Sequence, residues 1–180
     1  ERVAAVVDAD PNEIVFTSGG TESINLALQG LWHARPPGSS AIVLPDGEHH
    51  ATMDTVAALV DEGAELRRVL VTPEARIDPE EFAALLPGAA LATALAANNE
   101  AGAINDARAL AAHKDAGPPP AAGALAAAAA AADVPLRLDA VAALGHVPLS
   151  FRSLRGEAGG GVGLVAMSLA GHKIGAPVGV

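Results

Sequence analysis

Short runs of apolar and β-branched residues recur along the chain, and between them apolar positions return every three or four residues. The short runs predict buried strands, and the segments between them predict helices. We expect strands over residues 14–16, 41–44, 68–71, 91–95, 136–138 and 163–167. This alternation predicts an α/β fold with three layers, α/β/α, around a mostly parallel sheet that is covered on both faces.

Two of the expected helices have recognisable ends. Asp78 can cap a helix that begins at Pro79, and Glu81 completes a capping box with Asp78. A second helix is expected over residues 106–116, because a glycine that tolerates left-handed backbone follows them directly. The sequence therefore predicts where these two helices begin and end.

Two stretches interrupt the alternation. Residues 117–132 are rich in proline and alanine and are interpreted as an insert. Their part from Leu125 to Ala132 favours helix, but it offers little apolar area and is expected to pack weakly. Residues 155–161 are glycine-rich and are expected to form a flexible loop.

Composition narrows the classes of protein. A chain of 180 residues that is 51% hydrophobic predicts one compact domain, and the absence of cysteine excludes disulfides, thiolate metal sites and cysteine nucleophiles within it. A net charge of -10 argues against a nucleic-acid partner, since such binding depends on basic residues. The longest uncharged stretch has too few large apolar side chains for a membrane span, and no segment resembles a secretory signal. We therefore expect a cytoplasmic protein that is not bound to a membrane.

Lys173 is the most informative single residue, because it follows an apolar stretch that is expected to be a strand and comes directly after His172. A lone lysine in a glycine-rich loop is usually a solvated charge, so the rest of the chain must decide its role. Pyridoxal 5'-phosphate, which binds a lysine amine covalently, also needs an acid for its ring nitrogen and donors for its phosphate. The sequence supplies candidates for each of these groups.

Asp139 is the candidate acid. It ends the apolar run 136–138, which places its carboxylate at the carboxyl edge of a buried strand, although a helix or turn cap is the alternative. Residues 18–21 follow one expected strand and open a helix, where free N–H groups and the helix dipole favour phosphate. Gly20 permits close approach and the Thr21 hydroxyl is a further donor; an ordinary capped turn is the alternative.

Two further side chains suit the flat ring of this cofactor. His49 can stack on the ring and carry protons near neutral pH, and Asn99 can donate its amide to a phenolate oxygen. Both residues can equally be structural turn residues. His49 and His50 are adjacent, and no histidine pair has the spacing of a zinc site, so no metal site is expected.

With these residues in view, the chain resembles the class V aminotransferases of fold type I, and among them the cysteine desulfurases. The matching segments are residues 13–27, 48–51, 98–102, 138–140 and 171–177, in the order of the family. The resemblance implies the large, pyridoxal-phosphate-binding domain of fold type I. It implies that Lys173 carries the cofactor, that Asp139 pairs with the ring nitrogen, that His49 stacks and shuttles protons, that Gly20, Thr21 and His172 hold phosphate, and that Asn99 contacts the ring oxygen.

The resemblance also implies a reaction and partners. Family members transfer sulfur from L-cysteine to a persulfide and release L-alanine, which serves iron-sulfur cluster assembly and sulfur metabolism. They are homodimers and pass sulfur to acceptor proteins.

Two positions depart from the family pattern, since Ala142 replaces a glutamine and Ala170 replaces a hydroxyl residue. Each change removes a hydrogen bond to the cofactor that is worth about 1 kcal/mol.

We expect residues 1–180 to be part of the large domain, truncated at both ends, without the C-terminal small domain. The substrate-binding arginine and the persulfide cysteine would be missing with it, which leaves open whether this polypeptide is an enzyme by itself. One alternative is another class V pyridoxal-phosphate enzyme, such as a selenocysteine lyase or an aminotransferase. The other is a non-catalytic remnant or a dimerisation module.

Overall fold

The computed structural model describes residues 1–105, 121–155 and 162–175. Five strands of these ranges form one sheet in the order β2-β1-β3-β4-β5, and every pair of neighbours is parallel. The strands are β1 (Ala41–Pro45), β2 (Glu65–Val69), β3 (Ala89–Leu95), β4 (Leu136–Asp139) and β5 (Leu164–Ser168).

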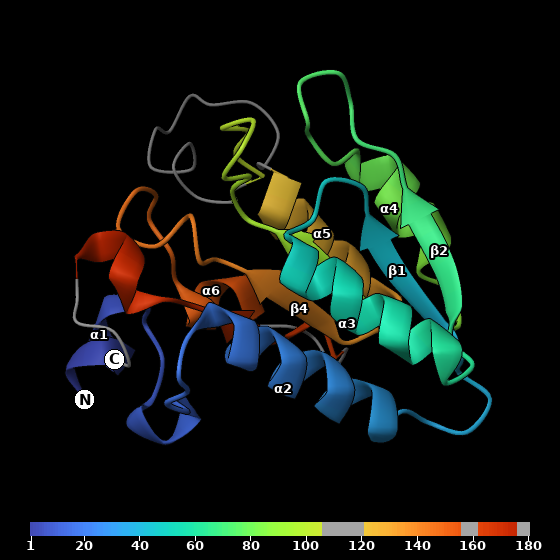
Figure 1. The fold of residues 1–180 in the computed structure, drawn as a ribbon, viewed down its shortest axis with the longest axis horizontal. Coiled ribbons are helices and arrows are strands. Elements are labelled where there is room, and N and C mark those ends of the chain that lie inside the picture. Colours follow the sequence, from blue (N-terminus) through green and yellow to red (C-terminus); the bar gives the residue numbers. More distant parts are fainter. Residues whose placement is uncertain (106–120, 156–161, 176–180) are drawn as a thin grey trace.

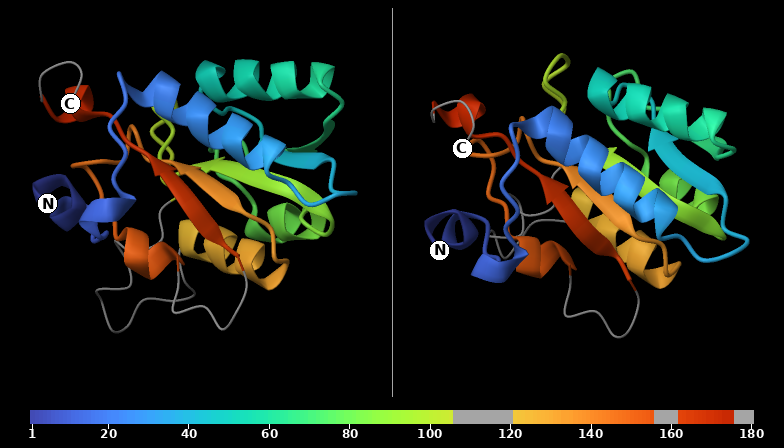
Figure 2. Two further views of the ribbon diagram at one scale, coloured as in Figure 1. Left: turned by 90° about the horizontal axis from the view of Figure 1, so that it is seen from below. Right: turned by 60° about the horizontal axis from the view of Figure 1, so that its bottom comes forward.

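Helices cover both faces of the sheet (Figures 1 and 2). Helices α2 (Gly20–His33) and α3 (His50–Asp61) lie on one face, and α4 (Pro79–Leu85), α5 (Ala121–Ala131) and α6 (Phe151–Arg155) lie on the other. The predicted α/β/α arrangement around a parallel sheet is therefore confirmed. Within the described ranges, none of these helices combines the length and the apolar character that crossing a bilayer requires.

Each face of the sheet has its own apolar cluster. The cluster under α2 and α3 contains Ile24, Leu28, Trp32, Ile42, Val56, Leu59 and Leu91, and the cluster under α4, α5 and α6 contains Val43, Phe82, Leu86, Leu125, Leu136, Leu138 and Leu154. Side chains alternate between the two faces along a strand. Because Leu136 and Leu138 of β4 point to the second cluster, Arg137 and Asp139 point to the face that α2 and α3 cover.

Helix α5 is a full member of the core, so the expectation of weak packing is wrong. Leu125 and Ala129 are both 0% exposed and belong to the same cluster as Phe82 of α4. Small alanine side chains bury little area each, but they allow the helix to lie close against its neighbours. Three further expectations fall wholly or partly outside the described residues. These are the helix expected over residues 106–116, most of the loop expected over 155–161, and the proposed insert, which is described only from residue 121 on.

Five of the six expected strands are found, with boundaries that differ by up to three residues. The exception is the segment 14–16, which is not a strand although its residues favour extended backbone. Val15 and Phe16 are 71% and 69% exposed there, and no strand in the described part of the chain pairs with them. A strand needs a hydrogen-bonded neighbour, so β-branched sequence alone does not make one.

The start of α4 is largely as predicted. Pro79 is its first residue, and the Asp78 carboxylate accepts the backbone N–H groups of Glu80 and Glu81 at 2.8 and 3.4 Å. The predicted capping box is only half formed, because the Glu81 carboxylate accepts the N–H of Leu70 at 3.2 Å instead of closing back on Asp78.

We expect Asp78→Ala to lower the free energy of unfolding by about 1 kcal/mol, because two N–H groups at the start of α4 lose their acceptor. Urea unfolding followed by circular dichroism measures this change. Glu74→Ala removes an exposed carboxylate from the preceding loop and is the matched control. Equal stability of the two variants would contradict the capping role.

The N-terminal segment is fastened to α6. After α1 (Arg2–Val6), the carbonyls of Val7 and Asp8 accept the N–H groups of Phe151 and Arg152. The Arg152 guanidinium then pairs with the carboxylates of Asp8 and Asp10 at 3.6 and 3.0 Å.

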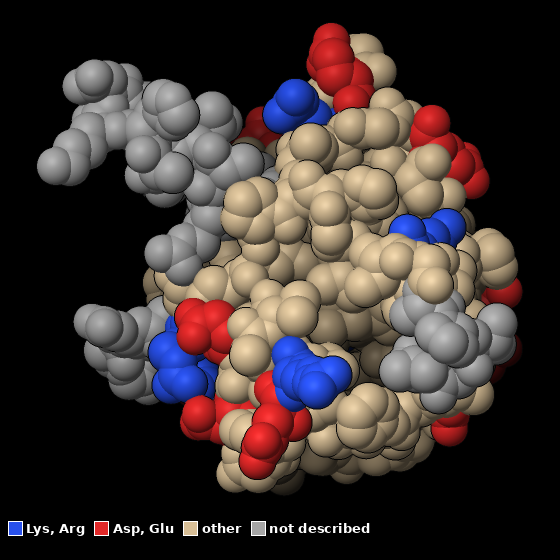
Figure 3. Space-filling model, turned by 90° about the vertical axis from the view of Figure 1, so that its left-hand side faces the viewer, with Lys and Arg blue, Asp and Glu red and all other residues tan. Residues whose placement is uncertain are grey.

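Figure 3 views the molecule from the side that carries α1, and acidic and basic side chains lie next to one another on this face. The described part of the face therefore has no broad patch of one charge.

Candidate functional site

A pocket of about 330 Å³ opens at the carboxyl edge of the sheet, between the starts of α2 and α3 and the short 3-10 helix η2 (Gly171–Ile174). Its lining includes all seven residues that the sequence singled out, although they are spread over most of the chain. These are Gly20, Thr21, His49, Asn99, Asp139, His172 and Lys173. The structure thus brings the predicted amine, carboxylate, imidazole and helix start to one place.

The parallel sheet explains this convergence. Leu95 at the end of β3 pairs in register with Asp139 at the end of β4, and both line the pocket. Asp139 in turn pairs with Ser168 at the end of β5, three residues before η2 begins. Since all the strands run in one direction, the segments that follow them leave the sheet at the same edge.

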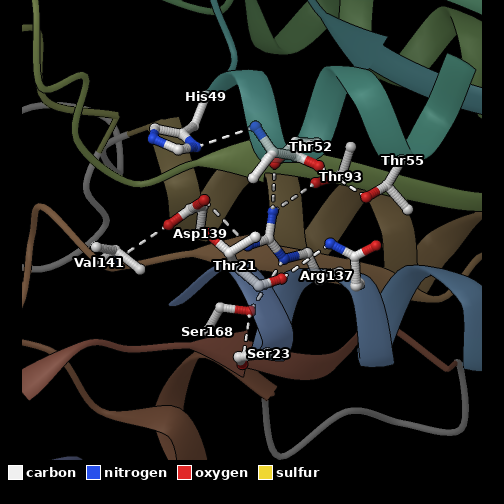
Figure 4. A network of polar contacts seen from close by, with 12 residues as sticks. Thr21, Ser23, His49, Thr52, Thr55, Thr93, Arg137, Asp139, Val141 and Ser168 are labelled. Carbon is white, nitrogen blue, oxygen red and sulfur yellow. Dashed lines mark hydrogen bonds and ion pairs between the residues drawn. The ribbon is translucent and has the colours of Figure 1, made fainter. Parts of the chain in front are cut away.

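Asp139 is the buried anion of the pocket, with only 1% of its surface exposed. Its Oδ1 atom accepts the backbone N–H of Val141 at 3.1 Å, and its Oδ2 atom accepts an N–H of Arg137 at 3.0 Å (Figure 4). A carboxylate oxygen has two lone pairs. Each oxygen therefore retains one site for a further donor that enters the pocket.

Helix α2 presents its positive end to the pocket. Its N-cap, Gly19, is extended at φ 162°, and no side chain caps the helix. A Cβ atom on Gly20 would lie 2.9 Å from a methyl carbon of Val141, so only glycine allows the helix start to approach this wall so closely. Free N–H groups and the helix dipole together favour an anion at this place.

His49 has a structural role as well as its place in the pocket. Its Nδ1 atom accepts the N–H of Ala51 at 3.1 Å and so caps α3. Burial lowers the pKa of His49. The adjacent His50, whose ring centroid is 4.0 Å away, lowers this pKa further, as does Lys173. The negative charge of Asp139 acts in the opposite direction. The neutral ring therefore carries its proton on Nε2, the nitrogen that the cap leaves free.

The two neighbouring asparagines have different environments. The Asn98 amide donates to the carbonyl of Gly47 at 3.0 Å and accepts the N–H groups of Glu100 and Ala101 at 2.9 Å. Asn98 is thus the turn residue that the sequence allowed for. Asn99 is exposed and lines the pocket.

Lys173 and His172 reach the pocket from η2, and both side chains are exposed. The backbone N–H of Lys173 donates to the carbonyl of Ala170 at 3.3 Å, which begins the turn. Ala142, one of the two departures from the family pattern, lies in the wall of the pocket. Ala170 is only 4% exposed and packs behind the start of α2, where its methyl group would contact a Cβ at Gly20.

Sequence reasoning missed two charged residues beneath the pocket. Arg137 is 0% exposed, and Glu48 is 5% exposed. Neither carboxylate oxygen of Glu48 has a hydrogen-bond partner among the described residues. Burial raises the pKa of Glu48 to about 8. The positive charge of Arg137 opposes this rise, and the negative charge of Asp139 adds to it. The Leu95 backbone and the Thr52 hydroxyl also oppose the rise, although neither is placed to form a hydrogen bond with the carboxyl group. Glu48 is therefore a neutral acid at pH 7.

The position of Arg137 offered a signal. It stands between two leucines in a strand that is buried on both faces, so its guanidinium had to lie inside the protein with partners. Glu48 offered no comparable signal, because it lies in a polar loop after β1.

The groups in the pocket fit pyridoxal phosphate. An amine, a carboxylate with free lone pairs, a neutral imidazole and an uncapped helix start match the cofactor's aldehyde, ring nitrogen, aromatic face and phosphate, respectively. The fold and this pocket define a coenzyme-binding domain of the α/β class. Residues 1–180 match the model of the family described as aminotransferase class-V, and the chain belongs to this family, whose members depend on pyridoxal phosphate.

Curated relatives and solved structures agree with this assignment. The chain is 36% identical to an IscS-like cysteine desulfurase of Mycobacterium tuberculosis and 34% identical to the cysteine desulfurase IscS of Actinobacillus succinogenes, with 100% and 99% of the chain covered. The alignments cover 42% and 39% of those relatives, so the chain spans about two fifths of their length. The structure of DndA from Streptomyces lividans matches with a TM-score of 0.77 at 31% identity, over 99% of this chain and 44% of DndA. A NifS-like protein matches with a TM-score of 0.82 at 26% identity, over 99% and 43%.

Proposed function

We propose that the chain is the pyridoxal-phosphate-binding part of a cysteine desulfurase. The observation that carries the proposal is the convergence of seven residues, from five separate segments, on one pocket at the carboxyl edge of the sheet. The similarity to cysteine desulfurases over 99–100% of the chain supports the same conclusion.

Each residue has a role that follows from its chemistry. Lys173 supplies the amine that binds the cofactor covalently, and the free lone pairs of Asp139 accept a hydrogen bond from the ring nitrogen. The start of α2, with Gly20 and Thr21, holds phosphate together with His172, and Asn99 donates to the ring oxygen. When bound, the cofactor supplies an electron sink for the carbon atoms of an amino acid.

His49 is the proposed proton carrier. Because its Nδ1 atom accepts the N–H of Ala51, only Nε2 remains free to give or take a proton. Its lowered pKa keeps the ring neutral at pH 7, so that it stacks on an aromatic ring without adding a charge. Catalytic roles for Lys173 and His49 are therefore compatible with the observed contacts.

The wider function belongs to the same proposal. L-cysteine is the proposed substrate, and sulfur passes to a persulfide and then to an acceptor protein for iron-sulfur cluster assembly, in a cytoplasmic homodimer. Because the chain contains no cysteine, the persulfide must form on a cysteine outside residues 1–180. In the proposed domain organisation, residues 1–180 are a partial large domain with a Pro/Ala-rich insert over residues 117–132.

Incubation of the chain with pyridoxal phosphate tests the central claim. We expect a visible absorption band and, after borohydride reduction, a stable adduct on the peptide that contains Lys173, found by mass spectrometry. Lys173→Ala should abolish this adduct. The chain has only one other lysine, Lys114, so Lys114→Ala is the matched control and should leave the adduct in place. An adduct that survives Lys173→Ala would contradict the assignment of the amine.

A non-catalytic protein of the same fold is the second candidate, and Ala142 favours it. Its methyl group occupies the pocket wall and cannot donate a hydrogen bond. A protein that remains colourless with pyridoxal phosphate and forms no adduct would support this candidate.

A further inference from the structure

Arg137 lies directly behind Asp139 and is the only described cation that contacts this carboxylate. Both side chains are almost completely excluded from water, at 0% and 1% exposure, and they are two residues apart on the same face of β4. Their N–H···O distance is 3.0 Å. At this depth the interaction of the two charges is screened far less than at the surface.

Hydroxyl groups from three different elements hold the guanidinium in place. Its Nη1 atom donates to Thr52 of α3 and to Thr93 of β3, both at 3.2 Å, and its Nε atom donates to Ser168 of β5 at 3.3 Å (Figure 4). Ser168 also accepts a hydrogen bond from Ser23 of α2 at 3.1 Å. The cation therefore cannot turn away from Asp139 without breaking several buried contacts.

Apart from Arg137, the titratable groups of the buried part of the pocket add little net charge near Asp139. Glu48, which lies at the start of the segment leading into α3, is neutral at pH 7. His49 is neutral as well, and His172 and Lys173 lie on η2 at the exposed side of the pocket. A pyridine nitrogen that binds Asp139 therefore meets a carboxylate whose charge is already compensated by Arg137.

We propose that Arg137 is a positioning residue that holds Asp139 in place. Its positive charge also lowers the affinity of Asp139 and the nitrogen of a bound pyridine ring for the proton that they share. This inference rests on the proposed function. A lone buried carboxylate would keep that nitrogen protonated over a wide pH range, because the proton cancels an otherwise isolated charge. With Arg137 in place, the protonation of the ring nitrogen, on which the electron sink depends, varies with pH.

Pyridoxal phosphate labelled with ¹⁵N in its ring tests the proposal by NMR, without any measurement of activity. In the unmodified protein we expect the ¹⁵N shift of the bound ring to titrate between about pH 6 and pH 8, where Glu48 keeps its proton and the Arg137–Asp139 pair carries no net charge. A ring that is still fully protonated at about pH 8 would overturn the proposal. This measurement needs no variant and does not depend on how well substitutions at Arg137 fold.

Two variants sharpen the test. Arg137→Gln keeps a donor for Asp139 but removes the charge, so the proton affinity of the ring nitrogen should rise at least about tenfold. Arg137→Lys keeps the charge and should restore a titration close to that of the unmodified protein. A purely structural Arg137 would give the same titration in all three proteins, as long as the Lys173 adduct forms, and that result would overturn this proposal alone. If no adduct forms in the unmodified protein, the proposed function falls together with it.

Discussion

Glu48→Gln should remove most of the pH dependence of stability of this protein. The pKa of Glu48 is about 8 in the folded state, against an ordinary value of 4.5. The folded state therefore binds a proton that the unfolded state releases between these two values. The stability that the protonated Glu48 contributes is therefore fully present below pH 4.5, falls as the pH rises towards 8, and is absent above it.

The expected effect is large for a domain of this size. The difference of about 3.5 between the two pKa values corresponds to at most about 5 kcal/mol in the free energy of unfolding. Such a loss is comparable with the whole stability of a small domain. Glutamine resembles the protonated acid, so Glu48→Gln should match the unmodified protein near pH 5 and exceed it by several kcal/mol at pH 9.

Urea unfolding at pH 5, 7 and 9 measures this effect. Glu100→Gln is the matched control, because Glu100 is exposed at the same edge of the sheet and should leave the pH dependence unchanged. A stability that is equal at pH 5 and pH 9 in the unmodified protein would show that Glu48 is ionised, with partners that the described contacts do not include.

Gly145→Ala should strongly reduce formation of the Lys173 adduct by displacing Ile174, which follows the lysine. Gly145 has φ +79°, and a Cβ atom there would lie 2.5 Å from the Cγ2 atom of Ile174, the residue after Lys173. This separation is far below a van der Waals contact, so Ile174 must move. We expect at least a tenfold loss of adduct at a fixed concentration of pyridoxal phosphate, because the reacting atoms need close positioning.

A second substitution separates this contact from general strain. Gly88 has a similar φ of +72°, but a Cβ atom there meets nothing within 4 Å. Gly88→Ala should therefore lose about 1–2 kcal/mol of stability from its backbone alone and retain the adduct. Adding Ile174→Ala to Gly145→Ala removes the clashing methyl group and should restore the adduct. If the double variant remains inactive towards the cofactor, the contact does not explain the loss.

Much of the fold could be predicted because parallel strands leave a strong signal. Residues 91–95 are a nearly continuous apolar run, and residues 136–138 are two leucines on either side of Arg137; they form β3 and β4 almost as expected. The edge strand β2 was less predictable, because only one neighbour constrains it and most of its side chains are exposed. Its sequence therefore carries little apolar pattern, and its predicted start and end lie three and two residues too far along the chain.

The members of the candidate site were predictable, but their support was not. Asp139 ends an expected strand, and His49 and Lys173 lie in the segments that follow expected strands. Because all three have reactive side chains, their position and their chemistry both indicate one edge of the sheet. The cap that His49 provides for α3 depends on the rotation of its ring, which the sequence does not encode in any local pattern. Contacts such as Arg137 with Thr52, 85 residues apart, depend on the packed structure.

The contact between Ser23 and Ser168 joins residues 145 positions apart and places the start of α2 beside the last strand of the sheet. During synthesis on the ribosome, α2 is made early, but part of the platform on which it docks emerges only when β5 has been translated. Its apolar face packs with α3, β1 and β3, which are complete much earlier, so only the contact at the start of α2 waits for β5. The closing step of folding during synthesis is therefore a late, long-range assembly at the start of α2.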